Sequence, residues 1–169
     1  NGIGTSPIML WLQHLAGIEN GHYLLLDHQE LVEELFAVMS SGQLERAEVI
    51  AGHTDSELVY MIENTSTTLI SPDQYRKYCK RQLRQISDVL HKHGKRLGLH
   101  MCGYVNELLP DIEYVQANAF EALTPPPVAN TTLSQARAVC NNTCLIGGTG
   151  AVTWLNPAKE IIAEIEGYL

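Results

Sequence analysis

Short apolar segments alternate with helical segments along most of the chain, and this order constrains the fold more than any other feature of the sequence. The predicted strands are 57–62, 96–101, 118–123 and 143–146, and the helices that follow them are 71–93, 105–109, 133–141 and 157–168. Strands of one sheet that are joined through a helix run parallel. The sequence therefore predicts an α/β fold with four consecutive strand–helix units of parallel sheet.

The alternation alone leaves two architectures open, an open doubly wound sheet and a closed (β/α)8 barrel. No G-x-G-x-x-G motif follows any predicted strand, which weakens the dinucleotide-binding version of the open sheet. A closed barrel takes roughly 250 residues. Four units in 169 residues therefore correspond to about half of a barrel.

The helix after the first strand has clear signals at both ends. Ser71 supplies an N-cap, Pro72 occupies the first helical position, and Gly94 supplies a left-handed stop. We expect 71–93 to be the longest helix of the protein.

Two further helical segments precede the first strand. The segment 30–39 carries apolar residues at a spacing of three and four, which predicts a helix with one buried face. These apolar residues are Leu31, Leu35, Phe36 and Met39. A second helix, 44–51, is expected to begin after Gly42.

Composition and charge argue against several classes of partner. The sequence has 19 acidic and 11 basic residues, a net charge of −8, which is the wrong sign for binding a phosphate backbone. No apolar run reaches the roughly 18 residues of a membrane-spanning helix. We expect neither nucleic acid nor membrane as a partner.

The cysteines indicate a reducing compartment. Four of them in 169 residues are too few for a disulfide scaffold, and no charged-then-apolar signal segment precedes them. A cytoplasmic location is therefore expected. Cys140 and Cys144 are interpreted as core thiols rather than as a metal-binding pair.

Polar residues or glycines follow every predicted strand. In both architectures chemistry gathers at the carboxyl ends of the strands, because helices cover the faces of the sheet. Near these ends we expect one set of side chains and glycines to contact a substrate. These are Asn64, Thr65, Glu121, Thr124, Gly147 and Gly148.

His100 and Cys102 form the most informative pair at these strand ends. Alternate residues of a strand point to the same face, so an imidazole and a thiol converge there. Zinc accepts both ligands and needs two more groups to complete a tetrahedron. The spacing alone equally suits a core histidine beside a buried thiol, which is the commoner case. Glu63, after the preceding strand, is either a further ligand or a solvated loop acid.

Taken together, these segments resemble the uroporphyrinogen decarboxylase superfamily, and especially its corrinoid-linked methyltransferase branch. The resemblance rests on the stretches 63–66, 69–72, 99–103, 121–127 and 146–148, which occur in the family's order. It implies a partial TIM (β/α)8 barrel in which the four strands are the fourth to the seventh. Residues 1–169 would then be the C-terminal part of the barrel, without its first half and last strand.

The resemblance also implies a metal site and a reaction. In the similar methyltransferases a His-x-Cys pair binds zinc together with an acidic residue from an earlier strand and a second cysteine from the eighth. The corresponding residues here are Glu63, His100 and Cys102. The implied function is a methyltransferase in which a zinc-activated thiolate accepts a methyl group from a corrinoid, or the reverse transfer.

The implied partners are a corrinoid protein or a small-molecule methyl donor, and a thiol acceptor. A half-barrel leaves open strand edges, and apolar residues such as Leu99 and Met101 are expected to lose their covering inside it. We therefore expect the chain to form a homo-oligomer and to be inactive by itself.

Two alternatives remain open at this point. The first is a carboxy-lyase of the uroporphyrinogen decarboxylase type, acting without a metal on a tetrapyrrole, as in porphyrin biosynthesis, or on another carboxylate. The second is a non-catalytic domain that binds a corrinoid protein.

Overall fold

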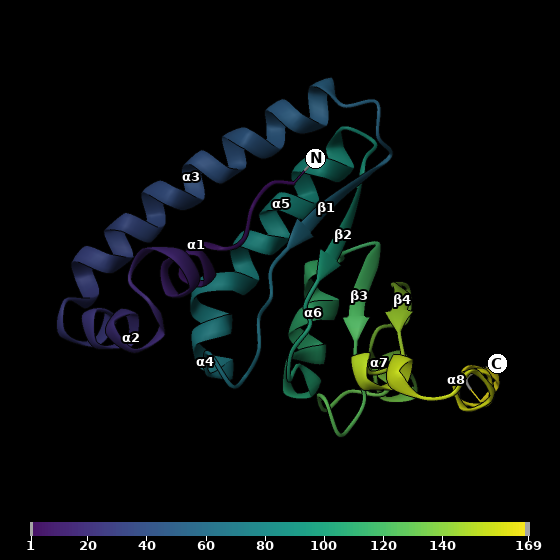
Figure 1. Cartoon of the computed structure of the whole chain (residues 1–169). Helices are drawn as coiled ribbons and strands as arrows, with labels where there is room; N and C mark the ends of the chain where they lie inside the picture. Colours follow the sequence, from purple (N-terminus) through teal and green to yellow (C-terminus); the bar gives the residue numbers. More distant parts are fainter. Residues whose placement is uncertain (1, 168–169) are drawn as a thin grey trace.

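The structure is a computed structural model that describes residues 2–167 (Figure 1). The helices are α1 (Pro7–Leu10), α2 (Ile18–Asp27), α3 (Gln29–His53), α4 (Pro72–Tyr75), α5 (Arg81–Lys92), α6 (Leu109–Val115), α7 (Leu133–Val139) and α8 (Ala158–Glu166). The strands are β1 (Leu58–Ile62), β2 (Arg96–His100), β3 (Ala119–Leu123) and β4 (Cys144–Gly147). Two π-helical turns, Trp11–Leu15 and Arg76–Lys80, and two 3-10 turns, Asn106–Leu108 and Ala151–Leu155, complete the list.

The four strands form one parallel sheet in the order β1-β2-β3-β4. Strand order follows chain order, and helices alternate with the strands (Figure 1). This is the arrangement of a partial TIM barrel, in which each helical crossover places the next parallel strand beside the last one. The predicted α/β fold class is confirmed.

One face of the sheet packs against the helices, and the other is open. Val59, Leu97 and Phe120 are at most 1% exposed and pack with the helices in a single core. Their neighbours along the strands point the opposite way, and Leu58 and Ile146 on that face are about half exposed, at 45% and 46%. The open face corresponds to the inside of a barrel.

Leu99 and Met101 were expected to lose their covering in a half-barrel. This expectation is wrong, since both are fully buried. Leu99 is paired with Met61 in the sheet, and both side chains point to the helix-covered face. Because side chains alternate along the strand, these apolar residues pack against the helices and His100 lies on the open face.

The helix predicted at 71–93 has the expected ends but is not the longest helix. Ser71 and Gln74 form a capping box, and Gly94 has a φ of 69°. Between these ends, α4, a π-helical turn and α5 follow one another directly. The longest helix is α3, with 25 residues.

The break predicted at Gly42 does not occur, and α3 runs through it. The predicted buried face is confirmed for Phe36, which is 5% exposed, and for Met39, which packs against the core. Leu31 and Leu35 lie outside it, at 66% and 40% exposed, and Val32, at 6%, is buried in their place. The reason is that α3 packs on one side only, against α5 and the N-terminal helices.

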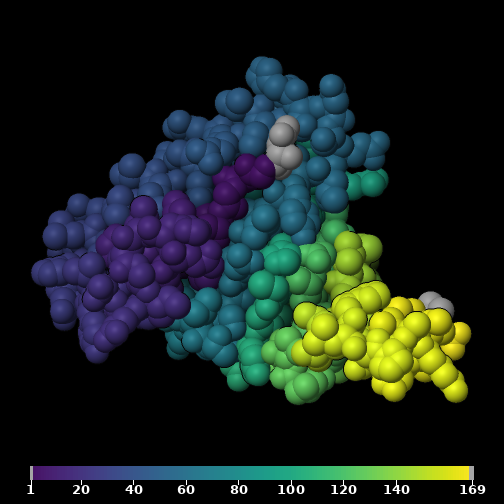
Figure 2. Space-filling model, viewed as in Figure 1, coloured from purple at the N-terminus to yellow at the C-terminus, as the bar shows by residue number. Residues whose placement is uncertain are grey.

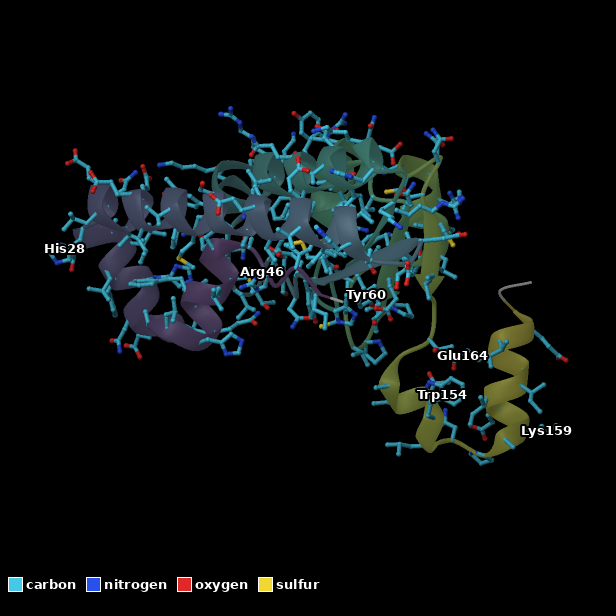
Figure 3. All side chains as sticks on the ribbon, turned by 90° about the horizontal axis from the view of Figure 1, so that it is seen from above. His28, Arg46, Tyr60, Trp154, Lys159 and Glu164 are labelled. Atoms are coloured by element: carbon cyan, nitrogen blue, oxygen red, sulfur yellow. The ribbon has the colours of Figure 1, made fainter. Side chains whose placement is uncertain are left out.

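The C-terminal elements stand apart from the sheet. Figures 1 and 3 show α8 away from the other helices, and Figure 2 shows residues of this end, in yellow, projecting from the surface. None of the residues of α8 is buried. Tyr168, at the end of the predicted helix 157–168, lies outside the described residues.

Within residues 2–167, none of the helices has both the length and the apolar character needed to cross a membrane.

Candidate functional site

The open face of the sheet carries a hydrogen-bonded group of three side chains from three adjacent strands. Tyr60 comes from β1, His100 ends β2, and Glu121 is paired with His100 on β3. Glu121 Oε2 accepts a hydrogen bond from Tyr60 Oη and is also bonded to His100 Nδ1. Tyr60 Oη lies 3.2 Å from the same His100 Nδ1. The three groups therefore close a triangle.

The environment sets the charge of this group. Burial raises the pKa of Glu121, but the hydrogen bonds from Tyr60 and His100 outweigh burial, and the pKa is lowered overall. Burial and the bond to Glu121 raise the pKa of Tyr60 well above its usual value. Near neutral pH, Glu121 is thus a carboxylate and Tyr60 a neutral phenol that donates to it.

Cys102 lies two residues beyond His100, and its side chain is exposed. Its Sγ is 3.5 Å from Asn64 Oδ1. Asn64 has a φ of 53°, a left-handed conformation that Asn tolerates better than most residues. The amides of Glu63 and Asn64 both donate to the carbonyl of His100, so this turn is fixed to the end of β2.

Glu63 lies on the other side of the sheet and is fully buried. Its Oε2 accepts from Ser6 N at 2.7 Å and from Thr5 Oγ1 at 3.3 Å, and its Oε1 accepts from Ser6 Oγ and from Thr65 Oγ1, the latter at 3.1 Å. Burial raises the pKa of Glu63 to about 6, although these hydrogen bonds act in the opposite direction. Thr65 is fully buried in the same network, rather than open to a substrate.

The sequence predicted that Glu63 lies beside His100 and Cys102. The structure instead places Glu63 away from them. His100 is paired with Ile62, and the next residue, Glu63, points to the opposite face. Asn64 occupies the position beside Cys102 instead.

The remaining predicted residues lie at the carboxyl ends of β3 and β4. Thr124 Oγ1 donates to the carbonyl of Ala122 at 3.0 Å, and Gly148 N donates to the carbonyl of Leu123 at 2.8 Å. A Cβ at Gly147 would lie 2.7 Å from Leu123 N. The two glycines thus allow close approach of β3.

The donor set suits zinc only in part. His100 and Cys102 offer an imidazole and a thiol, which zinc prefers, whereas Glu63 is held elsewhere. Across residues 2–167 there is no group of three or more His, Cys, Asp or Glu side chains arranged to hold a metal ion. The described residues thus supply two candidate zinc ligands, His100 and Cys102. Glu121 is hydrogen-bonded to His100.

Two residues of the site region were not predicted from the sequence. Tyr60 lies in the middle of an apolar strand, and only the register of β1 against β2 places it near His100. Ser6 is 57 residues from Glu63 along the chain. The alternation of β1 gives Tyr60 the same face as Ile62, but no sequence signal pairs Ser6 with Glu63.

Comparison with known proteins extends this picture. A methyltransferase from Methanosarcina mazei has a similar structure, with a TM-score of 0.72 at 17% sequence identity, over 95% of this chain and 47% of that chain. The likeness shows the fold, and the chain spans about half the length of that protein. A search of the curated proteins gave no match. The sequence matches the family model of uroporphyrinogen decarboxylase (URO-D) over residues 1–169. The chain therefore belongs to the uroporphyrinogen decarboxylase (URO-D) family.

Proposed function

We propose that this chain is part of a methyltransferase that moves a methyl group between a corrinoid and a thiol, with His100 and Cys102 as zinc ligands. The observation that supports the proposal best is the imidazole of His100, bonded to Glu121 through Nδ1 and followed by the exposed thiol of Cys102. A carboxylate behind a histidine is the usual support of a histidine that binds a metal.

When bound, zinc would act as a Lewis acid that holds the acceptor thiol as its thiolate near neutral pH. His100 would bind the metal through Nε2, because Nδ1 is engaged by Glu121. Cys102 would bind as a thiolate, and the site's remaining ligands would come from outside residues 2–167. With two donors of its own, the 169-residue chain is expected to be inactive alone.

A cleft beside these residues offers room for a reactant. It has a volume of about 350 Å³ and reaches Asn64, whose amide oxygen lies against Cys102. Its other lining residues are Gly2, Gly4, Thr5, Leu10, Gln13, His14 and Ile62. Amide, imidazole and apolar groups together suit a small polar molecule with an apolar part.

The test is a methyl-transfer assay on the full-length protein loaded with zinc. Methylcobalamin is the donor, 2-mercaptoethanol is the acceptor, and loss of the methylcobalamin absorbance is the readout. Loss of an outer-shell partner typically costs 10–100-fold, so His100→Ala and Cys102→Ser are each expected to lower the rate by more than about 100-fold. Cys144→Ser, which changes an exposed thiol on β4, should leave the rate unchanged.

Three results would contradict the proposal. One is full activity of both ligand variants. Another is release of carbon dioxide from a tetrapyrrole carboxylate in the presence of a chelator, which would favour the decarboxylase. The third is binding of methylcobalamin or of a corrinoid protein with no turnover, which would favour a binding domain.

A further inference from the structure

Tyr60 reaches its partners by lying across a neighbouring strand. It is paired in the sheet with Gly98 of β2, and its hydroxyl meets Glu121 on β3, one strand further. A Cβ at Gly98 would lie 2.9 Å from Tyr60 Cδ2 and 3.4 Å from Cε2. Any larger residue at this position would push the ring out of its place. Gly98 thus provides the space in which the phenol crosses β2.

The ring lies on the open side of the sheet. Figure 3 labels Tyr60 on the side away from the long helices, and the residues before and after it, Val59 and Met61, are at most 1% exposed. The rings of Tyr60 and His100 are 6.3 Å apart, with an interplanar angle of 61°. This edge-on contact adds to the hydrogen-bonded contact of the hydroxyl in restraining the imidazole.

The donors and acceptors of the triangle fit only one arrangement. Tyr60 has a single O–H, and it donates to Glu121. Its oxygen, and Glu121 Oε2, are then both acceptors that face His100 Nδ1. Two acceptors at one ring nitrogen require that this nitrogen carry the proton. In the neutral ring, Nε2 then has the free lone pair.

We propose that Tyr60 is a positioning residue that holds His100 in the Nδ1–H tautomer through Glu121, with Gly98 as the gap that lets it do so. The assignment of the tautomer follows from the contacts alone. Its consequence for metal binding rests on the proposed function, since the presented Nε2 is the ligand atom there. Without the phenol, Glu121 loses one of its two donors and the carboxylate can turn away from His100.

The experiment reads the tautomer directly in the full-length protein without metal. Long-range ¹H–¹⁵N NMR on protein labelled at histidine distinguishes Nδ1–H from Nε2–H at a pH at which the ring is neutral. Peaks of His100 are assigned with His100→Gln. The wild type is expected to show Nδ1–H, and Tyr60→Phe a mixture of the two tautomers. Tyr23→Phe, which changes an exposed tyrosine on α2, is the matched control and should leave the spectrum unchanged.

Zinc affinity, measured by competition with a chromophoric chelator, is the second readout. Tyr60→Phe is expected to weaken zinc binding by about 10-fold or more, as loss of a residue behind a ligand does. Gly98→Ala should give the same spectral change and the same weakening, whereas Gly42→Ala, where a Cβ meets nothing within 4 Å, should give neither.

The two proposals fail in different ways. An Nε2–H tautomer in the wild type, or spectra and affinities of Tyr60→Phe that equal those of the wild type, would overturn the positioning role. A wild type that shows the Nδ1–H tautomer and its loss in Tyr60→Phe, but that binds no zinc, would keep the positioning role and overturn the proposed metal site.

Discussion

Glu63 and His100 show how an offset of one residue separates two side chains that the sequence places together. Both come at the carboxyl end of a strand, but Ile62 rather than Glu63 is the partner of His100. Glu63 therefore enters the core side, where Ser6 and Thr65 satisfy it. Because side chains alternate between the two faces of a strand, a shift of one residue decides whether a polar group lies on the open face or in the core.

Buried Glu63 makes a prediction for the pH dependence of stability. Its pKa is about 6 in the folded protein and 4.5 ordinarily, so the folded state binds more protons between these values. The stabilisation that Glu63 contributes is then fully present below about pH 4.5 and is lost as pH rises through 6. The difference corresponds to about 2 kcal/mol of unfolding free energy by pH 7.

Urea unfolding between pH 4 and 7 measures this decrease. Glu63→Gln should remove the contribution, while Glu57→Gln, at a side chain that is 86% exposed, should leave the pH profile as it is. An identical profile for wild type and Glu63→Gln would mean that the carboxyl is not responsible.

Among the elements, α3 tests how much a glycine interrupts a helix. Gly42 lies inside α3, and a Cβ there meets nothing within 4 Å. Because Gly costs roughly 0.5–1 kcal/mol relative to Ala in a helix interior, Gly42→Ala is expected to stabilise the protein by about that amount. Thermal unfolding measures it, and a destabilised variant would show that the helix does not continue through this position.

The joint between β3 and β4 depends on a glycine in the opposite way. Gly147 has a φ of 145°, and an added Cβ would collide with the backbone of Leu123. Such a conformation costs a non-glycine residue about 1–3 kcal/mol before any collision is counted. Gly147→Ala is expected to destabilise the protein by at least about 2 kcal/mol and to speed hydrogen exchange in β4. Unchanged exchange at Leu145 would argue against this joint.

Several large apolar residues are exposed on the part of the molecule that the structure describes. On the open face and the C-terminal elements these include Leu58, Ile62, Ile146, Trp154 and Leu155, and Leu155 is 85% exposed. Covering such surface is worth roughly 25 cal/mol per Å² of apolar area, which favours association.

We expect the 169-residue chain to self-associate through this face. Sedimentation velocity should show dimers or larger species at micromolar concentration, and Ile146→Lys should shift them toward monomer. Leu26→Lys, at an exposed leucine of α2, is the control and should have little effect. A well-folded monomer for the unsubstituted chain would contradict this expectation.

The sequence by itself determined the order of elements, because apolar strands, helix caps and stop signals act over a few residues. Ser71 and Gly94 were correctly placed as helix ends, and His100 and Cys102 as strand-end residues. The family resemblance was likewise visible in these local stretches, and the family match confirms it.

Only the tertiary structure decided which of these residues meet. The register of β1 on β2 brought Tyr60 to His100 and Glu121, and packing of the N-terminal segment bonded Ser6 to Glu63. Local patterns fix neither, because a pairing between strands depends on the fit of distant side chains against a shared core.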